Sequence, residues 1–337
     1  MEKRVLGRSG IEVSPIGLGC FPIGGPFRGA DGRIFAYGKV NDEESIETIH
    51  RAIELGVNFF DTADIYGAGH SERILGVALS DYKDNFVIAT KFANVFDEKT
   101  KTGKGKNVEP AYIQSAIEAS LKRLQVDVID IYQLHDSQHD PASAVNVRNT
   151  LEDLVSEGLI RYYGWSTDDP DRAKVFAEGK HCTSVQYCLS LQITNEGMLD
   201  LCNKYNLASI IRSPLQSGTL TGKRGSSVKL PEDHMLHGVD FASDRFKLIN
   251  QKLDQLRQLL IGDGRTIIQA ALAYLWSTSE TTVPIPGART VEQIEENART
   301  MEFGPLSPEL VKQIDELFSD IKRDMLSTSP HHQVKKE

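Results

Sequence analysis

The sequence predicts a single α/β domain in which eight parallel strands, each followed by a helix, close into a (β/α)8 TIM barrel. Short continuous apolar runs alternate with helical patterns, and the links from helix to strand are short. Continuous apolar strands are typical of parallel sheets covered on both faces, and eight strand–helix units make a closed barrel. The expected strands are residues 14–19, 57–63, 85–91, 127–135, 160–167, 183–191, 208–214 and 281–286.

The segments between these strands have the composition and end signals of helices. In the first of them, 41–56, Asn41 is the expected N-cap, Glu44 completes a capping box, and Gly56 ends the helix. Seven more helices are expected at 71–82, 109–124, 141–158, 169–180, 195–206, 265–279 and 290–301.

Two segments lie outside this alternation. The N-terminal stretch 4–13 resembles a hairpin around Gly10 that could plug the floor of the barrel, and a final helix is expected at about 307–322. We therefore expect residues 1–325 to form one domain and 326–337 to be a flexible polar tail.

Composition excludes several classes of protein. The chain has 337 residues, a formal net charge of −9 and a pI near 5.6, whereas a nucleic-acid binder needs a basic stripe. The four lysines of "KTKTGKGK", residues 99–106, are interpreted as a solvated flexible loop. No signal peptide or membrane span is apparent, and the four cysteines lack C-x-x-C spacing, so we expect free thiols in a reducing cytoplasm.

Three links from strand to helix are long, at about 20–40, 92–109 and 215–246. In a barrel these links lie at the C-terminal ends of the strands, where barrel active sites are built. The first carries four aromatic residues that are candidates to wall a substrate pocket: Phe21, Phe27, Phe35 and Tyr37.

Polar residues gather where three consecutive strands end. The second strand leads to Asp61 and Tyr66, the third ends with Lys91 and the fourth with His135. A free phenol has a pKa near 10, and a nearby ammonium group lowers it. We expect Asp61 to pair with Lys91, Lys91 to tune Tyr66, and His135 to orient a substrate oxygen. The group can protonate an oxygen and contains no nucleophile with its base.

A proton donor of this kind needs an electron source, and the usual nucleotide motifs are absent. "GLGCFPIGG" has Pro22 where a third glycine belongs, and "GTLTGKR" misses the P-loop spacing. Barrels also hold phosphate between the loops after strands seven and eight. Here residues 213–224 offer small residues with Lys223 and Arg224, and Arg289 precedes a helix N-terminus. A dinucleotide with an extra phosphate would fit these loops.

The motifs "GVNFFDTADIYG", "ATK", "LH", "GWST", "SPLQSGTLTGK" and "PIPGARTVEQIEEN" resemble the aldo-keto reductases, and the similarity extends from the N-terminal hairpin to about residue 303. Within that family, the sequence is similar to the bacterial branch that also resembles potassium-channel beta subunits. The resemblance implies an NADPH-dependent barrel that moves hydride between nicotinamide and a carbonyl or alcohol substrate. Its catalytic tetrad falls on Asp61, Tyr66, Lys91 and His135, with Tyr66 as the general acid or base.

The resemblance also implies a set of residues that contact the cofactor. Ser166 and Gln186 are expected at the carboxamide, and Arg289 at the 2′-phosphate of NADPH. The full expected set is Cys20, Phe21, Asp61, Ser166, Thr167, Gln186, Arg212, Ser213, Pro214, Leu215, Ser217, Gly218, Lys223, Gly287, Arg289, Gln293, Glu296 and Asn297.

Two positions depart from the pattern of the family. Thr167 stands where many members have Asn or Arg, and Arg212 where many have an aromatic residue that stacks on nicotinamide. Arg212 could stack through its planar guanidinium or bind an anionic substrate; the second hypothesis predicts that Arg212→Ala weakens acidic aldehydes more than neutral ones.

Two alternatives remain open at this point. One is a nucleotide-binding regulatory subunit with the same fold and little turnover. The other is a metal-dependent hydrolase with His135 and His139 as ligands, although no third ligand is evident. The sequence does not identify the substrate or the oligomeric state.

Overall fold

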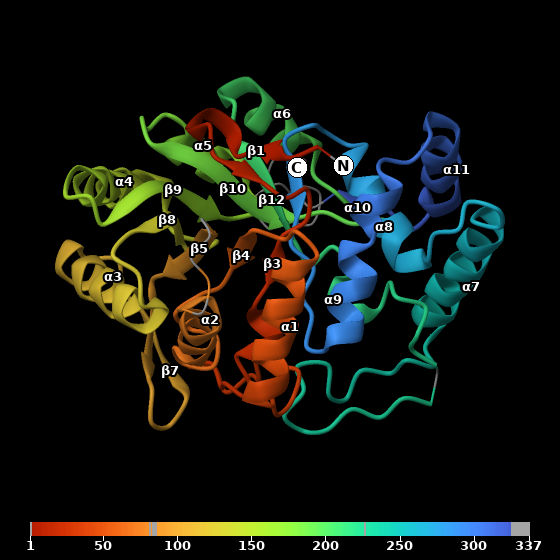
Figure 1. The fold of residues 1–337 in the computed structure, drawn as a ribbon, viewed down its shortest axis with the longest axis horizontal. Coiled ribbons are helices and arrows are strands. Elements are labelled where there is room, and N and C mark those ends of the chain that lie inside the picture. The colour runs from red at the N-terminus through yellow and green to blue at the C-terminus, as the bar shows by residue number, and fades with distance from the viewer. Residues whose placement is uncertain (1, 81, 83–85, 226, 325–337) are drawn as a thin grey trace, which may run out of the picture.

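The computed structural model describes residues 2–80, 82, 86–225 and 227–324, and its centre is an eight-stranded parallel sheet. The order of its strands is β13-β12-β10-β9-β8-β5-β4-β3 (Figure 1), so the predicted strands follow one another around the sheet in chain order. They are β3 (Leu18–Gly19), β4 (Phe59–Asp61), β5 (Val87–Phe92), β8 (Ile129–Leu134), β9 (Ile160–Ser166), β10 (Cys182–Cys188), β12 (Ala208–Arg212) and β13 (Thr282–Pro284).

The two edge strands meet and close the barrel. Gly17 N donates to Pro284 O at 3.0 Å, and Gly19 N donates to Pro286 O at 3.1 Å. This approach requires glycine, because a Cβ on Gly19 would lie 2.7 Å from Ile285 O. The predicted barrel class is therefore confirmed.

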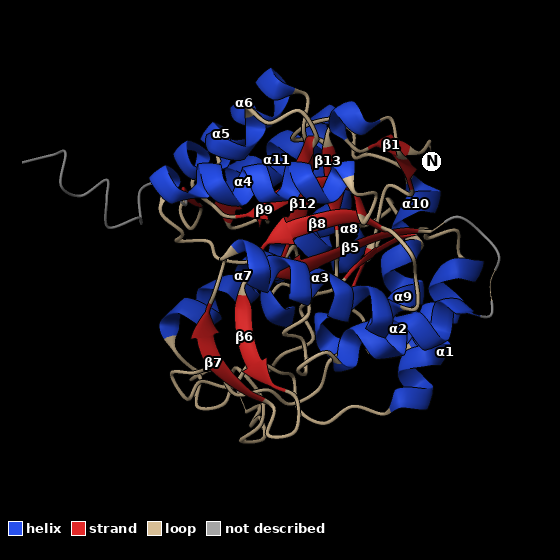
Figure 2. Cartoon of the chain, turned by 90° about the vertical axis from the view of Figure 1, so that its left-hand side faces the viewer, coloured by secondary structure: helices blue, strands red, loops and turns tan. Residues whose placement is uncertain are grey.

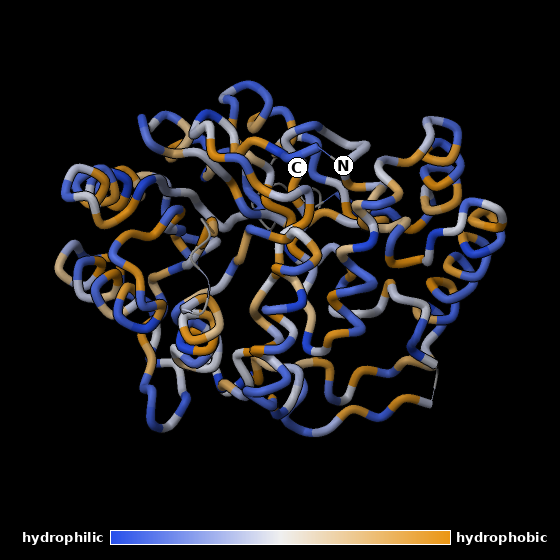
Figure 3. Tube along the Cα trace, viewed as in Figure 1, coloured by the Kyte–Doolittle hydropathy of each residue, from blue (hydrophilic) through white to orange (hydrophobic). Residues whose placement is uncertain are grey.

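Helices cover the outside of the barrel at the predicted places (Figure 2). The Asn41 side chain accepts hydrogen bonds from Glu43 N and Glu44 N, as expected of an N-cap. In Figure 3 these helices alternate hydrophilic and hydrophobic segments, as expected where one face packs on the strands. They are α1 (Asp42–Glu54), α2 (His70–Ser80), α3 (Pro110–Leu124), α4 (Pro141–Ser156), α5 (Pro170–Ala177), α6 (Glu196–Tyr205), α8 (Ile267–Trp276) and α9 (Val291–Ala298).

The predicted N-terminal hairpin is present and plugs the barrel. It consists of β1 (Arg4–Val5), the short 3-10 helix η1 (Gly7–Ser9) and β2 (Glu12–Val13). Its Leu6, Ile11 and Val13 are buried in one cluster with the inward side chains of the barrel strands. Figure 1 shows β1 at the end of the barrel opposite β7 and the long loops, so the plug lies on the floor and the loops lie at the mouth.

Two parts of the segments predicted to be long loops form strands or a helix. Residues 92–109 contain a hairpin of β6 (Asn94–Asp97) and β7 (Thr102–Lys106), which includes part of the lysine-rich stretch expected to be a flexible loop (Figure 2). Because its glycines and lysines lack apolar alternation, backbone pairing and not burial defines these strands. The third loop ends at the unpredicted helix α7 (Asp244–Leu259), although its buried Ile249, Leu253 and Leu256 have helical spacing.

Short elements complete the described chain. The 3-10 helices η2 (Phe21–Ile23) and η3 (Gln216–Gly218) lie in two of the mouth loops. The predicted final helix corresponds to α11 (Pro308–Phe318), preceded by α10 (Thr300–Phe303), and β11 (Ile193–Thr194) pairs with β14 (Arg323–Asp324).

Three other expectations concern exposure and chemistry more than fold. All four cysteines are free, as predicted, and the structure buries all of them. None of the helices in the described residues has the length and apolar character needed to cross a membrane. The proposed tail, 326–337, lies outside the described residues.

Candidate active site

A cavity of about 970 Å³ opens at the C-terminal ends of the strands, where the three long loops meet. Backbone hydrogen bonds tie these loops together: Arg28 N donates to Lys101 O at 3.0 Å, and Met235 N donates to Ala36 O at 2.7 Å. The four aromatic residues predicted to wall the pocket all line it: Phe21, Phe27, Phe35 and Tyr37.

The alternation of strand residues explains which polar side chains enter the barrel. Phe59, Val87, Ala89 and Ile131 point into the interior cluster. Successive side chains of a strand point to opposite faces, so residues two further along share that direction. The inward set therefore continues with polar residues towards the mouth: Asp61 on β4, Lys91 on β5, and Gln133 then His135 at the end of β8.

Lys91 is the centre of the polar cluster and is completely buried. Its ammonium donates to Asp61 Oδ1 at 2.6 Å, to Thr62 O at 2.7 Å and to the Tyr66 hydroxyl at 3.3 Å. An ammonium has three N–H donors, and these three contacts use all of them. The predicted pairing of Lys91 with Asp61, and its contact with Tyr66, are both present in the structure.

Asp61 is fixed by two amides as well as by Lys91. Its Oδ2 accepts from Gln133 Nε2 at 3.2 Å and from Gln186 Nε2 at 2.7 Å. Gln186 was expected at the nicotinamide carboxamide; here its amide donates to the Asp61 carboxylate. Sequence reasoning missed Gln133, although its inward position on β8, two residues before His135, was a usable signal.

Burial reverses the expected direction of the Tyr66 pKa. Removal of the phenol from water raises its pKa, and Asp61 adds to this, while Lys91 opposes both; the net pKa is raised. Lys91 lowers the pKa, as expected from the sequence, but the sequence-based reasoning left out desolvation, which raises the pKa by more. Burial lowers the pKa of Lys91, but Asp61 and Tyr66 outweigh it, so the pKa is raised and the ammonium stays charged.

His135 lies edge-on to Tyr66, with ring centroids 6.0 Å apart. Burial lowers the pKa of His135 well below its usual range, and the charges of Lys91, Arg212 and Lys106 lower it further. The ring is therefore neutral near pH 7, and its buried Nδ1 has no hydrogen-bond partner among the described residues. A neutral imidazole beside the phenol suits the orientation of a carbonyl oxygen better than the delivery of a proton.

Most of the residues expected to bind cofactor line this one cavity, and two do not. Cys20 and Thr167 are fully buried outside the lining, and the Thr167 hydroxyl donates to Ser137 O at 3.1 Å. The expected residues that line the cavity are Phe21, Asp61, Ser166, Gln186, Arg212, Ser213, Pro214, Leu215, Ser217, Gly218, Lys223, Gly287, Arg289, Gln293, Glu296 and Asn297.

The end of the cavity next to β12 and β13 has the donors that phosphate groups need. Arg224 donates to Ser217 O at 2.8 Å, while its Nη1 is buried without a partner in the described chain. Arg289 donates to Tyr37 O at 2.6 Å and to Lys39 O. The buried Arg224 nitrogen without a partner lies in one cavity with the cations Arg289 and Lys223, and this set suits an anionic ligand. The residues present therefore fit a phosphorylated dinucleotide.

Arg212 forms an ion pair with Asp168, which sequence reasoning did not identify. The other oxygen of Asp168 accepts from Cys188 N at 2.7 Å, so this carboxylate is anchored to the backbone at the end of β10. Arg212 lines the cavity with its charge largely balanced by that partner.

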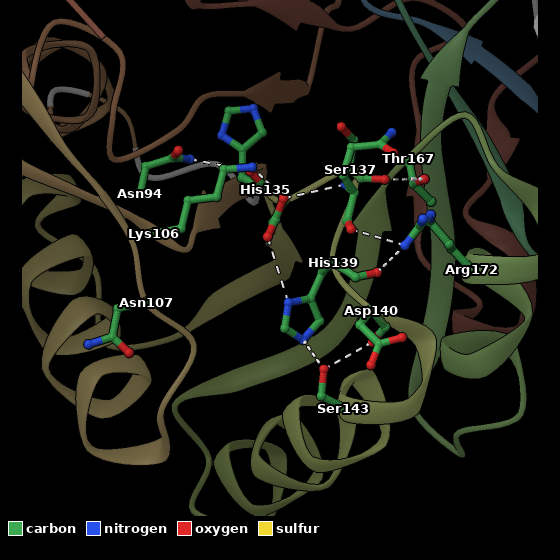
Figure 4. Close-up of polar contacts among 12 residues, drawn as sticks. Asn94, Lys106, Asn107, His135, Ser137, His139, Asp140, Ser143, Thr167 and Arg172 are labelled. Carbon is green, nitrogen blue, oxygen red and sulfur yellow. Dashed lines mark hydrogen bonds and ion pairs between the residues drawn. The ribbon is translucent and has the colours of Figure 1, made fainter. Parts of the chain in front are cut away.

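No cluster of three or more potential metal ligands occurs in the part of the chain that the structure describes. His139, which was considered as a ligand, interacts with Asp136 at 3.6 Å and with the Ser143 hydroxyl at 3.1 Å (Figure 4). These contacts explain His139 as part of the loop that follows β8.

Comparison with known proteins places this geometry in context. The model of the Aldo/keto reductase family matches residues 15–319. An uncharacterized oxidoreductase of Bacillus subtilis is 28% identical over 96% of this chain and 98% of its own. The holo form of an aldo-keto reductase from Bacillus halodurans superposes with a TM-score of 0.74 at 28% identity, over 94% and 96% of the two chains. A glycerol dehydrogenase from Gluconobacter oxydans gives a TM-score of 0.80 at 25% identity, over 95% and 96%.

Proposed function

The chain belongs to the aldo/keto reductase family, and from this we propose that it is an NADPH-dependent reductase of aldehydes or ketones, with Tyr66 as its general acid. The observation that carries the proposal is the contact chain from Asp61 through buried Lys91 to the Tyr66 hydroxyl, in a cavity that Tyr66 and His135 also line. The free cysteines agree with a reducing compartment, and we place the enzyme in the cytoplasm.

In the proposed reaction, bound NADPH supplies hydride to the carbonyl carbon. The Tyr66 hydroxyl donates its proton to the carbonyl oxygen, which gives an alcohol, and the phenolate is later reprotonated from solvent. Lys91 stabilises the phenolate while it exists, and Asp61 holds the ammonium in place. In the reverse direction the same phenolate accepts the proton of an alcohol.

Residues of the chain also account for cofactor and substrate orientation in this proposal. Arg224, Arg289 and Lys223 would hold the phosphates, because they are cations that line the cavity near β12 and β13. Neutral His135 would hold the carbonyl oxygen near Tyr66. Phe21, whose ring centroid lies 5.1 Å from that of Tyr66, would exclude water from the reacting groups.

The test compares the wild type with Tyr66→Phe on a panel of aldehydes and ketones, measured by NADPH absorbance. We expect kcat to fall by about 10²–10⁴-fold, the usual contribution of a general acid, with NADPH affinity unchanged. Tyr205→Phe is the matched control, because Tyr205 is at the end of α6 and does not line the cavity.

Three results would count against the proposal. Turnover that survives in Tyr66→Phe would remove Tyr66 as the acid. Tight NADPH binding without turnover of any substrate by the wild type would favour a nucleotide-binding regulatory protein. Failure of the wild type to bind NADPH would overturn the assignment of the phosphate residues.

A further inference from the structure

The lysine-rich stretch that the proposed function does not use delivers one of its side chains into the active site. Lys106 is the last residue of β7 and lines the same cavity as Tyr66 and His135. Its ammonium pairs with Asp136, the residue after His135, and its charge acts on the His135 ring. Lys104, two residues earlier on the same strand, is exposed and does not line the cavity.

The charges around the cavity leave Lys106 as a cation that faces the substrate side. Arg33 pairs with Asp31, Lys91 with Asp61 and Lys223 with Glu296, and all these acids line the cavity. The carboxylate of Asp136, in contrast, does not line the cavity, whereas Lys106 does. The ammonium of Lys106 therefore faces the cavity while its carboxylate partner lies beyond the lining, as with Arg212 and Asp168.

Lys106 also has uncharged polar neighbours suited to the same ligand. Asn94 and Ser137 line the cavity on either side of it, and Asn94 Nδ2 donates to His135 O at 3.3 Å. Figure 4 shows Asn94, Lys106 and His135 next to one another, with Ser137 on the following loop. Among the described residues, the contact of Asn94 uses its side-chain nitrogen and that of Ser137 uses its backbone oxygen, so the Asn94 side-chain oxygen and the Ser137 hydroxyl retain hydrogen-bonding capacity.

The contacts of Lys106 and Asp136 allow Lys106 to accept a substrate carboxylate as a partner. Lys106 is 47% exposed and has three N–H donors, of which Asp136 takes one. Asp136 in turn keeps other partners, because His139 lies 3.6 Å away and Gln138 N donates to it at 3.4 Å. A carboxylate of the substrate could therefore bind Lys106 without leaving Asp136 unpaired.

Resting on the proposed reductase function, we propose that Lys106, with Asn94 and Ser137, binds a carboxylate on the carbonyl substrate, so that the enzyme prefers aldehydes that carry an acid. The group lies on the loops after β5 and β8, away from the phosphate-binding residues after β12 and β13. A single ammonium with an amide and a hydroxyl matches a monoanion such as a carboxylate better than a phosphate dianion.

The test uses matched substrates and matched variants. 3-Carboxybenzaldehyde, 4-carboxybenzaldehyde and succinic semialdehyde are each compared with their methyl esters at saturating NADPH. We expect at least one acid to exceed its ester about tenfold in kcat/KM, because a charge-assisted contact has that magnitude. Lys106→Gln should bring the ratio of kcat/KM for acid and ester to within about twofold, because KM rises for the acid much more than for the ester. The control Lys104→Gln removes the same charge outside the cavity and should keep the preference.

Asp136→Asn gives a prediction of opposite sign. Removal of the competing carboxylate should lower KM for the acid, whereas a purely structural role of the pair would slow acid and ester alike. Lys106→Arg should retain part of the preference.

Several outcomes would overturn the inference while the reductase function stands, because the esters report turnover without the carboxylate that Lys106 is proposed to bind. The first is equal kcat/KM for acids and esters in the wild type. The second is an equal loss of kcat/KM for acid and ester in Lys106→Gln. The third is a loss of the acid preference in Lys104→Gln as large as that in Lys106→Gln. If glyceraldehyde 3-phosphate has a higher kcat/KM than glyceraldehyde in the wild type but not in Lys106→Gln, while no acid exceeds its ester, the ligand is a phosphate and not a carboxylate. If the wild type reduces no ester or acid, the proposed function itself fails.

Discussion

The two ends of the cavity hold their charged side chains in different ways. At the end proposed to be catalytic, here called the catalytic end, Lys91 and Asp61 are at most 3% exposed and come directly from barrel strands. At the end proposed to hold the cofactor phosphates, here called the phosphate end, Lys223 is 63% exposed in its pair with Glu296, and Arg289 is bound to carbonyl oxygens of the first mouth loop. The first arrangement has no exchangeable partner, whereas the second consists of contacts that an incoming phosphate can replace.

This difference separates two tasks of the site. Groups fixed before substrate arrives lower the barrier of the chemical step because they need not reorganise. Groups held by replaceable contacts bind a ligand that must also leave. Variants at the catalytic end should therefore change kcat and stability, and variants at the phosphate end should change cofactor affinity.

The largest expected effect comes from Lys91→Met. Loss of the ammonium leaves Asp61 as a buried charge without its main partner, which costs about 3–5 kcal/mol in free energy of unfolding. Activity should fall by at least about 10²-fold, because the Tyr66 hydroxyl loses the ammonium that contacts it at 3.3 Å. Urea denaturation and steady-state kinetics measure the two quantities.

The double variant Asp61→Asn with Lys91→Met separates these effects. It removes the unpaired charge, so it should recover much of the stability while activity stays low. If neither stability nor activity recovers, the effects of the two residues are independent. If both stability and activity recover, the ion pair has no role in catalysis.

At the phosphate end, we expect Arg289→Gln to weaken NADPH binding roughly 10–100-fold, which corresponds to about 1.5–3 kcal/mol for a charge-assisted hydrogen bond. Binding of NADH should change much less, and kcat at saturating NADPH should stay within about twofold. Fluorescence titration with both cofactors measures this. Arg299→Gln is the control, since Arg299 follows the same helix α9 and pairs with Glu295 at 3.7 Å outside the cavity. An equal loss for NADPH and NADH would remove the 2′-phosphate assignment.

The next effect concerns pH and His135. Its pKa is lowered by burial and by three cations, so between that depressed value and about 6.5 the unfolded chain binds more protons than the folded one. His135 therefore makes the free energy of unfolding decrease as pH falls below about 6.5, and adds no such dependence above it. His135→Gln should flatten this part of the curve in urea denaturation at pH 5 to 8, and an unchanged slope would contradict the neutral assignment. His237→Gln, on an exposed residue, is the control.

The same contrast explains what the sequence could predict. Asp61, Lys91 and His135 stand where three consecutive apolar strands end, so the common mouth of a parallel barrel predicted that they meet. The ion pair of Arg212 with Asp168 was not visible, because it joins two partly exposed side chains 44 positions apart, one at the end of β12 and one in the loop after β9. The direction of the Tyr66 pKa was also out of reach, since it depends on how much water the neighbouring loops exclude.

The place of Lys106 was hidden for a related reason. Four lysines and two glycines give no burial pattern, and only the register of β6 with β7 separates Lys106 at the cavity from Lys104 on the exposed surface. Backbone pairing of that kind is specified by turn geometry and by neighbouring loops such as 28–34, which periodicity does not describe.

The smallest effect tests Thr167, which was expected to contact the cofactor but lies outside the cavity lining. Its hydroxyl donates to Ser137 O at 3.1 Å and accepts from Asp169 N at 3.2 Å, so it holds the loop that follows His135. Thr167→Val should cost about 1–2 kcal/mol in free energy of unfolding for the lost hydrogen bonds, with NADPH affinity within twofold of the wild type. Ser166→Ala is the contrasting variant, because Ser166 lines the cavity and its loss should weaken NADPH binding. A large loss of NADPH affinity in Thr167→Val would mean that the loops at this end rearrange on binding, and the catalytic end would then be less rigid than its buried ion pair implies.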